Sequence, residues 1–276
     1  MTRTETEATP ATRVADEHPG GEQQLAESLD RIVEMGKPRL HRRTPELLAT
    51  GTVAGIEVSI GVLALIAVTN ATGSVLLGGL AFSFGFLALL LGHSELFTEG
   101  FLVPVTVVAA GEATVWQMIR LWVGTLVANL AGGWLLLWIA MTAYPEWHPT
   151  AVQSGTYFID QGITGRSLCL AILAGAVITL MTRMVNGSES MPVRVCAVIA
   201  CGFVIAGLRM SHSVLESLLI FAALHTHHAT FGYGDWVGWF GWTALGNLIG
   251  GLGLVTALRL LRSRHMLARH RQEATG

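Results

Sequence analysis

The chain has 276 residues, of which 51% are hydrophobic and 13% are charged. Soluble domains carry about 25% charged residues, so the composition excludes an ordinary soluble protein and predicts a polytopic membrane protein in a lipid bilayer. The formal net charge of -2 gives no reason to expect a nucleic-acid partner.

Residues 1–44 are expected to form a cytoplasmic tail that contains a short amphipathic helix. Apolar side chains recur at helical spacing in residues 23–35, at Leu25, Leu29, Ile32 and Val33. This pattern is typical of a helix that lies on the membrane surface or against a neighbouring helix. At the other end of the chain, residues 262–276 are expected to form a basic cytoplasmic tail.

Between the tails, residues 45–261 are predicted to form an all-α transmembrane pore domain with six crossings. Its two halves are expected at about 45–143 and 165–261. In chain order, the expected crossings cover about residues 45–69, 75–110, 116–143, 166–185, 191–230 and 236–261.

The second crossing is too long for one straight helix. About 35 residues would make roughly 50 Å of helix, against a hydrocarbon core of about 30 Å. Residues 92–104 (GHSELFTEGFLVP) lie inside this run, and their polar side chains would be costly facing lipid. Irregular backbone at membrane depth persists only where protein buries it or where it lines a cavity. We therefore predict a broken helix, with a re-entrant loop between its two halves.

The fifth crossing is interrupted in the same way by residues 209–217, RMSHSVLES. One short match between the halves pairs His93-Ser94 with His212-Ser213, 119 residues apart. Another pairs residues 129–133 (NLAGG) with 247–251 (NLIGG), 118 residues apart. Chance explains either match alone, whereas both in the same order favour an ancient duplication. Interrupted helices at corresponding positions of two halves indicate a transport site.

The distribution of Lys and Arg sets the expected orientation. The flanks assigned to the cytoplasm hold nearly all the basic residues, whereas the assigned outer loops hold only Arg166. By the positive-inside rule, both termini are expected on the cytoplasmic side of the inner (plasma) membrane. Three crossings per half then give the two halves opposite orientations, as in an inverted repeat.

Three features together resemble the signature of the formate/nitrite transporter family. They are Gly92–Pro104 with its core S-E-L-F-T at 94–98, His212 in the second break, and the run G-N-L-I-G-G at 246–251. The resemblance covers about residues 47–261. It implies an aquaporin-like six-helix protomer, a homopentamer with one pore per protomer, and a central histidine at His212.

The sequence departs from the typical pattern of this family in its charges. The family's lysine near the outer end of the fourth crossing is missing, since the only lysine is Lys37. Glu216 stands where the family usually has an asparagine, four residues after the central histidine. The run H-S-E-L-F-T-E at 93–99 is similar to a divergent, inner-membrane branch of the family.

The expected function is a channel or transporter for a small solute. The resemblance implies a monovalent weak-acid anion such as formate or nitrite, or its acid, with proton coupling through His212. One alternative is a pentamer that does not conduct, or that selects cations or neutral solutes. Another is an intramembrane metalloenzyme with ligands His93, Glu95 and His212, although the chain has no HExxH spacing. We expect no enzyme activity, no cofactor and no bound metal.

The residues expected to line the pore or contact the substrate are His93, Glu95, Leu96, Phe97, Thr98, Glu99, Arg209, His212 and Glu216. Leu96 and Phe97 either form a hydrophobic constriction or belong to ordinary packing. Thr98 either gates the pore or caps a half-helix. His212 either relays a proton or is a neutral helix cap.

The acidic residues near the breaks also have more than one interpretation. Glu216 lies one turn after His212, so its carboxylate is expected to face the imidazole or to pair with Arg209. The carboxylate of Glu95 is expected to accept hydrogen bonds from backbone amides of the re-entrant loop. A second possible metal site is left open at the outer histidines, His225, His227 and His228.

Overall fold

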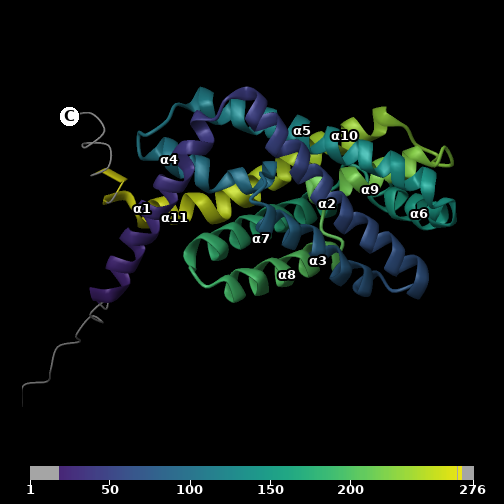
Figure 1. Cartoon of the computed structure of the whole chain (residues 1–276), viewed down its shortest axis with the longest axis horizontal. Coiled ribbons are helices and arrows are strands. Elements are labelled where there is room, and N and C mark those ends of the chain that lie inside the picture. The colour runs from purple at the N-terminus through teal and green to yellow at the C-terminus, as the bar shows by residue number, and fades with distance from the viewer. Residues whose placement is uncertain (1–18, 266, 269–276) are drawn as a thin grey trace, which may run out of the picture.

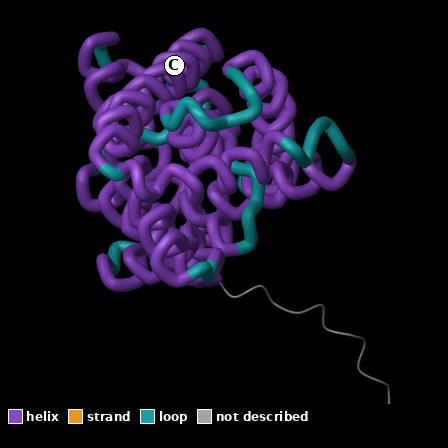
Figure 2. Tube along the Cα trace, turned by 90° about the vertical axis from the view of Figure 1, so that its right-hand side faces the viewer, coloured by secondary structure: helices purple, strands orange, loops and turns teal. Residues whose placement is uncertain are grey.

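A computed structural model describes residues 19–265 and 267–268, and every regular element in this part of the chain is helical (Figures 1 and 2). In chain order the elements are α1 (Pro19–His41), α2 (Thr44–Thr72), α3 (Val75–Gly92), η1 (Phe97–Phe101), α4 (Val103–Ala109), α5 (Val115–Ala143), η2 (Pro145–Trp147), α6 (His148–Ile159), α7 (Gly165–Gly187), α8 (Met191–Gly207), α9 (Ser213–His225), α10 (Tyr233–Leu248), η3 (Ile249–Ala257) and α11 (Leu258–Arg262). The start of the expected N-terminal tail and most of the basic tail lie outside the described residues.

Within the described residues, five helices are long and apolar enough to cross a membrane. They are Thr44–Thr72, Val75–Gly92, Val115–Ala143, Gly165–Gly187 and Tyr233–Arg262. The shorter apolar helices are Phe97–Ala109, Met191–Gly207 and Ser213–His225. Each of the apolar runs 75–110 and 191–230 is thus divided between two helical segments, with non-helical backbone between them.

Local sequence sets several of the helix ends. Thr114 and Gln117 form a capping box at the start of α5, and Thr164 and Ser167 form one at the start of α7. Helix α2 ends at Gly73, whose φ of 68° lies in the left-handed region that favours glycine.

Helix α6, between α5 and α7, was not expected from the sequence. It packs against α9, and its residues Ala151 and Phe158 are buried. Because apolar side chains cover this face, the connection after α5 forms part of the core. In Figure 1, α6 and α9 lie at one end of the molecule, and α1, α4 and α11 lie at the other.

Helix α1 is longer than the amphipathic helix expected from the sequence. It packs against α4, and Leu29 and Val33 are buried there together with apolar side chains after α4. Lys37 binds the carboxylates of Glu112 at 3.1 Å and Glu34 at 3.4 Å. The hydrogen bond to Glu112, more than that to Glu34, raises the pKa of the Lys37 ammonium above its usual value. The apolar face of α1 therefore has a protein neighbour.

The two halves of the chain repeat the same close backbone contacts. Gly55 of α2 lies against the backbone of Asn129, and Gly175 of α7 lies against the backbone of Asn247. An added Cβ at either glycine would overlap the carbonyl oxygen of the asparagine, so only glycine permits this approach. The glycine and the asparagine are separated by nearly the same number of residues in both halves, as expected for a duplicated unit.

The substitution Gly250→Ala tests this packing in the second half. A Cβ at Gly250 would overlap the carbonyl oxygen of Ile172 in α7, so the two helices must move apart. We expect the variant to lose about 1–3 kcal/mol of stability, as overpacked sites do, and to melt at a lower temperature in detergent. Gly253→Ala is the matched control, because a Cβ there meets no atom within 4 Å. Equal melting temperatures for the two variants would contradict the packing described.

Candidate functional site

The first break lies between α3 and η1 and is held by one asparagine of α5. The chain leaves α3 through His93, whose φ is 53°. The side chain of Asn129 accepts a hydrogen bond from the Phe97 N–H at 2.9 Å. Its amide nitrogen donates to the carbonyl oxygens of Glu95 at 3.0 Å and Gly51 at 2.8 Å. Asn129 thus satisfies backbone groups that a broken helix leaves without intrahelical partners.

The second break, between α8 and α9, has the same arrangement. The chain turns at Arg209, whose φ is 51°. Asn247 accepts a hydrogen bond from the Ser213 N–H at 2.8 Å. Its amide nitrogen donates to the carbonyl oxygens of Ser211 at 2.9 Å and Ala171 at 2.8 Å. One buried asparagine in each half therefore fixes the last residues of one break and ties them to a neighbouring helix.

These two asparagines were not among the expected site residues. The signal for them was the repeated NL-x-GG run, which the sequence analysis used only as evidence of duplication. The equivalent contacts also correct the pairing of the two breaks. Glu95 corresponds to Ser211 and Phe97 to Ser213, a separation of 116 residues, so the histidine match at 119 does not pair equivalent positions.

The two breaks meet at a hydrogen bond between Thr98 and His212. Thr98 Oγ1 and His212 Nε2 are 2.8 Å apart, and both residues are fully buried. His212 Nδ1 accepts a hydrogen bond from the Leu215 N–H at 3.1 Å, at the start of α9. The hydrogen bonds therefore assign the neutral ring, with its proton on Nε2 and donated to Thr98. His212 is a helix cap and, at the same time, presents one polar edge to the other break.

Leu96 and Phe97 lie beside this contact, in the main apolar core. Leu96 is fully buried, and the ring of Phe97 packs edge-on against Phe101 at a centroid distance of 5.3 Å. The indole of Trp122 donates to the Gly100 carbonyl oxygen at 2.9 Å. Both apolar side chains thus pack in the protein while flanking the Thr98 position.

The carboxylate of Glu95 does not bind the backbone amides of its loop, contrary to expectation. It pairs with the guanidinium of Arg42 at 2.8 Å and that of Arg39 at 3.7 Å, and Glu95 is only 4% exposed. Asn129 already serves the backbone of this loop, which leaves the carboxylate free for arginine. The pair joins the segment between α3 and η1 to the segment around the end of α1.

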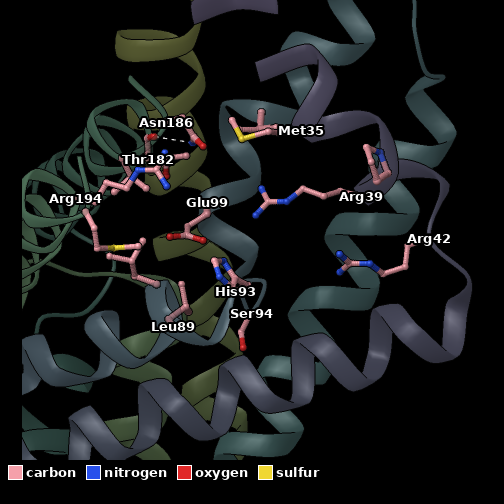
Figure 3. A pocket seen from close by; sticks show the side chains of 15 residues that line it. Met35, Arg39, Arg42, Leu89, His93, Ser94, Glu99, Thr182, Asn186 and Arg194 are labelled. Atoms are coloured by element: carbon pink, nitrogen blue, oxygen red, sulfur yellow. Dashed lines mark hydrogen bonds between the residues drawn. The ribbon is translucent and has the colours of Figure 1, made fainter. Parts of the chain in front are cut away.

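A cavity of about 300 Å³ opens beside the first break. Its polar lining includes Arg39, Arg42, Arg194, Glu99, His93 and Ser94. Figure 3 shows Glu99 and His93 near its centre, with Arg39 and Arg194 on opposite sides. We call this space the arginine cavity. Its three guanidinium groups supply donors that suit a small anion.

Glu216 lies in the first turn of α9, and neither of its expected side-chain pairs forms. Its Oε2 accepts from the backbone N–H of His212 at 2.7 Å, while the imidazole of His212 contacts Thr98. Arg209 does not lie within ion-pair distance of Glu216, and its guanidinium sits over the ring of Tyr157, 4.3 Å from the centroid. The carboxylate thus caps the backbone at the break.

The side chains considered as metal ligands in the alternative interpretations do not come together in the described part of the chain. Among the described residues, no group of three or more His, Cys, Asp or Glu side chains could hold a metal ion. His225 bonds the Trp134 carbonyl oxygen at 3.1 Å, and His228 lies instead beside His148, with ring centroids 5.9 Å apart. The expected His225, His227 and His228 cluster is therefore divided.

The ion pair of Glu95 makes a prediction about stability. Arg42→Met leaves a nearly buried carboxylate with the more distant Arg39, and we expect a loss of about 1–3 kcal/mol. Adding Glu95→Gln removes the uncompensated charge and should recover part of the loss. Thermal unfolding in detergent measures both, with exposed Arg43→Met as the matched control. Additive effects of Arg42→Met and Glu95→Gln would show that the pair does not anchor the loop.

Comparisons with known proteins identify the family. The sequence profile of the family described as "Formate/nitrite transporter" matches residues 26–261. "Formate channel FocA" of Escherichia coli (strain K12) is 29% identical over 150 residues, 50% of this chain and 52% of that protein, so the match spans about half the length of this relative. "Inner membrane protein YfdC" of the same strain is 23% identical over 252 residues, 88% of this chain and 80% of that protein.

Solved structures share the fold. "Pentameric formate channel with formate bound" matches with a TM-score of 0.68 at 18% identity, over 79% of this chain and 96% of that one. "FNT family ion channel" matches with a TM-score of 0.70 at 16% identity, over 87% of this chain and 99% of that one. Since the family profile covers most of the described helices, this multi-pass membrane protein belongs to the formate/nitrite transporter family.

Proposed function

We propose that the protein is a channel or transporter for a small monovalent weak-acid anion, of the size and charge of formate or nitrite, or for the neutral acid. The observation that carries the proposal is the 2.8 Å hydrogen bond between Thr98 and His212, which joins the two helix breaks. Non-helical backbone at membrane depth needs a protein or cavity environment, and buried polar edges there can replace part of a solute's hydration. Family membership supports the same class of solute.

The proposed topology has six crossings, two of them broken. The first half contributes α2, the interrupted α3 with η1 and α4, and α5, and the second contributes α7, the interrupted α8 with α9, and α10 to α11. Asn129 and Asn247 hold the two breaks through equivalent hydrogen bonds, and we call these two sets of bonds the asparagine clamps. Their repetition supports an inverted pair of such units. The arginine distribution supports an orientation with both termini and the arginine cavity on the cytoplasmic side of the inner membrane.

The arginine cavity is the proposed cytoplasmic mouth of the pathway. Its lining contains three guanidinium groups, those of Arg39, Arg42 and Arg194, and the carboxylate of Glu99. The carboxylate of Glu95 partly neutralises two of the three arginines. The remaining positive potential raises the local concentration of anions in front of Thr98.

His212 acts in this proposal as a neutral hydrogen-bond donor to the solute. Its Nδ1 is occupied by the Leu215 N–H, so forming an imidazolium would break the cap of α9. The Nε2–H group, in contrast, can release its hydrogen bond to Thr98 and donate to the passing solute instead. A neutral donor at membrane depth binds an anion without holding it as strongly as a fixed positive charge would.

The assembly proposed is a homopentamer with one pathway in each protomer. The fold shared with a structure described as a pentameric formate channel supports this, as does the family. Native mass spectrometry of the detergent-purified protein should therefore give a complex of five chains. A dominant dimer or trimer under conditions that preserve flux would contradict the pentamer.

Removing the hydroxyl of Thr98 tests the pathway. In proteoliposomes loaded with buffer, wild type should take up formate, and Thr98→Val should be about 2- to 10-fold slower, the effect of losing one hydrogen bond of ordinary strength. Thr106→Val is the matched control, because Thr106 is also fully buried but bonds only its own helix, through the Leu102 carbonyl oxygen. Formate uptake that is equal in wild type, both variants and empty liposomes would refute the proposed function.

A further inference from the structure

A second, much smaller cavity lies beside Glu216, whose carboxylate binds the His212 N–H. Its volume is about 20 Å³, enough for one water molecule, which needs about 10–15 Å³ on this measure. Glu216, Arg209, Thr69 and Ser154 supply its polar lining. We call it the Glu216 cavity. It is too small for formate, so its occupant must be water or a proton carried by water.

Two buried oxygen atoms at this cavity have no hydrogen-bond partner. They are Oε1 of Glu216, a residue that is 0% exposed, and Oγ1 of Thr69. The other carboxyl oxygen of Glu216 accepts one hydrogen bond, from the His212 N–H. This pattern fits a protonated carboxyl group, in which Oε2 is the carbonyl oxygen and Oε1 carries a proton into the cavity. An ionised carboxylate would leave a full charge with a single backbone donor.

The charged groups around Glu216 come from few elements. Arg209, between α8 and α9, is the only titratable side chain besides Glu216 in the cavity lining, and its guanidinium rests on Tyr157. Helices α2 and α6 present the hydroxyls of Thr69 and Ser154, and the rest of the lining, from α2, α3, α6, α8 and α9, is apolar. The nearest histidine, His212, has both ring nitrogens engaged elsewhere. Arg209 is half-buried, so the cavity lies between a fully buried acid and a more accessible cation.

We propose that Glu216 binds and releases a proton through this cavity, and that its charge controls whether anions pass His212. The inference rests on the proposed function. A hydronium ion in the cavity gives its proton to Oε1, which leaves one water molecule and a neutral carboxyl group. With Glu216 neutral, an anion at His212 meets no fixed negative charge. Loss of the proton to water places a carboxylate directly behind the His212 backbone, where it repels the anion.

The test compares Glu216→Gln with wild type at each pH. Glutamine keeps the acceptor for the His212 N–H and removes the titration. Formate uptake into proteoliposomes is measured from mildly acidic to mildly alkaline pH, and the variant-to-wild-type ratio cancels the changing fraction of formic acid. We expect a ratio near one in acid that rises at least tenfold in alkali. A ratio that stays constant across pH would overturn the role of Glu216 while leaving the proposed function intact.

Glu216→Asp is the conservative control and should retain the pH-dependent ratio to Glu216→Gln, because it keeps an acid at the cavity. An aspartate variant that behaves as the glutamine variant would overturn the proposal. A pH-induced infrared difference spectrum provides a readout without transport. Wild type should show a carboxylic-acid carbonyl band that Glu216→Gln lacks, and identical spectra would refute proton binding at Glu216. Absence of formate uptake at every pH in all three proteins would instead refute the proposed function.

Discussion

Two breaks in apolar helices can exist only if their backbone polar groups find partners without water. Asn129 and Asn247 meet this constraint: each accepts one hydrogen bond from a break and donates one to it, and each donates a second to the backbone of a neighbouring helix. Each unsatisfied group in hydrocarbon would cost several kcal/mol. Because the asparagine backbones lie directly against Gly55 and Gly175, the glycine packing and the loop geometry depend on each other.

The clamps also determine the distribution of charge along the proposed pathway. With residues 95–97 and 211–213 fixed, Thr98 and His212 lie side by side, while the carboxylate of Glu95 binds arginine and that of Glu216 binds the backbone N–H of His212. Glu95 is compensated by arginine. Among the described residues, Glu216 has no cation within ion-pair distance. A neutral hydrogen-bonding centre therefore lies between a compensated acid and an uncompensated one.

Much of the fold was predictable from hydropathy, because apolar length and interrupting polar residues report directly on membrane depth. The contact between Thr98 and His212 was not predicted, because 114 residues separate them and no local pattern links the two side chains. Helix α6 was missed because its short, mixed sequence carries no membrane-length signal. The partners of Glu95 were missed because a local rule favoured nearby amides, whereas Arg42 lies 53 residues earlier and approaches only in the tertiary structure. The sequence repeat contained Asn129 and Asn247, but nothing in it indicated that their side chains would bind the backbone of the breaks.

Zinc block of a Thr98→Cys variant tests most directly that Thr98 and His212 face the pathway together. A thiolate at residue 98 and Nε2 of His212 would lie close enough to share one Zn²⁺, whose bonds to sulfur and nitrogen are about 2.3 and 2.0 Å. Zn²⁺ would displace the Nε2 proton to water, which leaves Nδ1 free to keep accepting from the Leu215 N–H. Formate uptake by this variant should be blocked by Zn²⁺ and restored by a chelator. Uptake by wild type, which has three cysteines elsewhere, and by the Thr98→Cys/His212→Asn double variant should continue. Block that persists without His212, or no block in Thr98→Cys, would contradict a pathway through this contact.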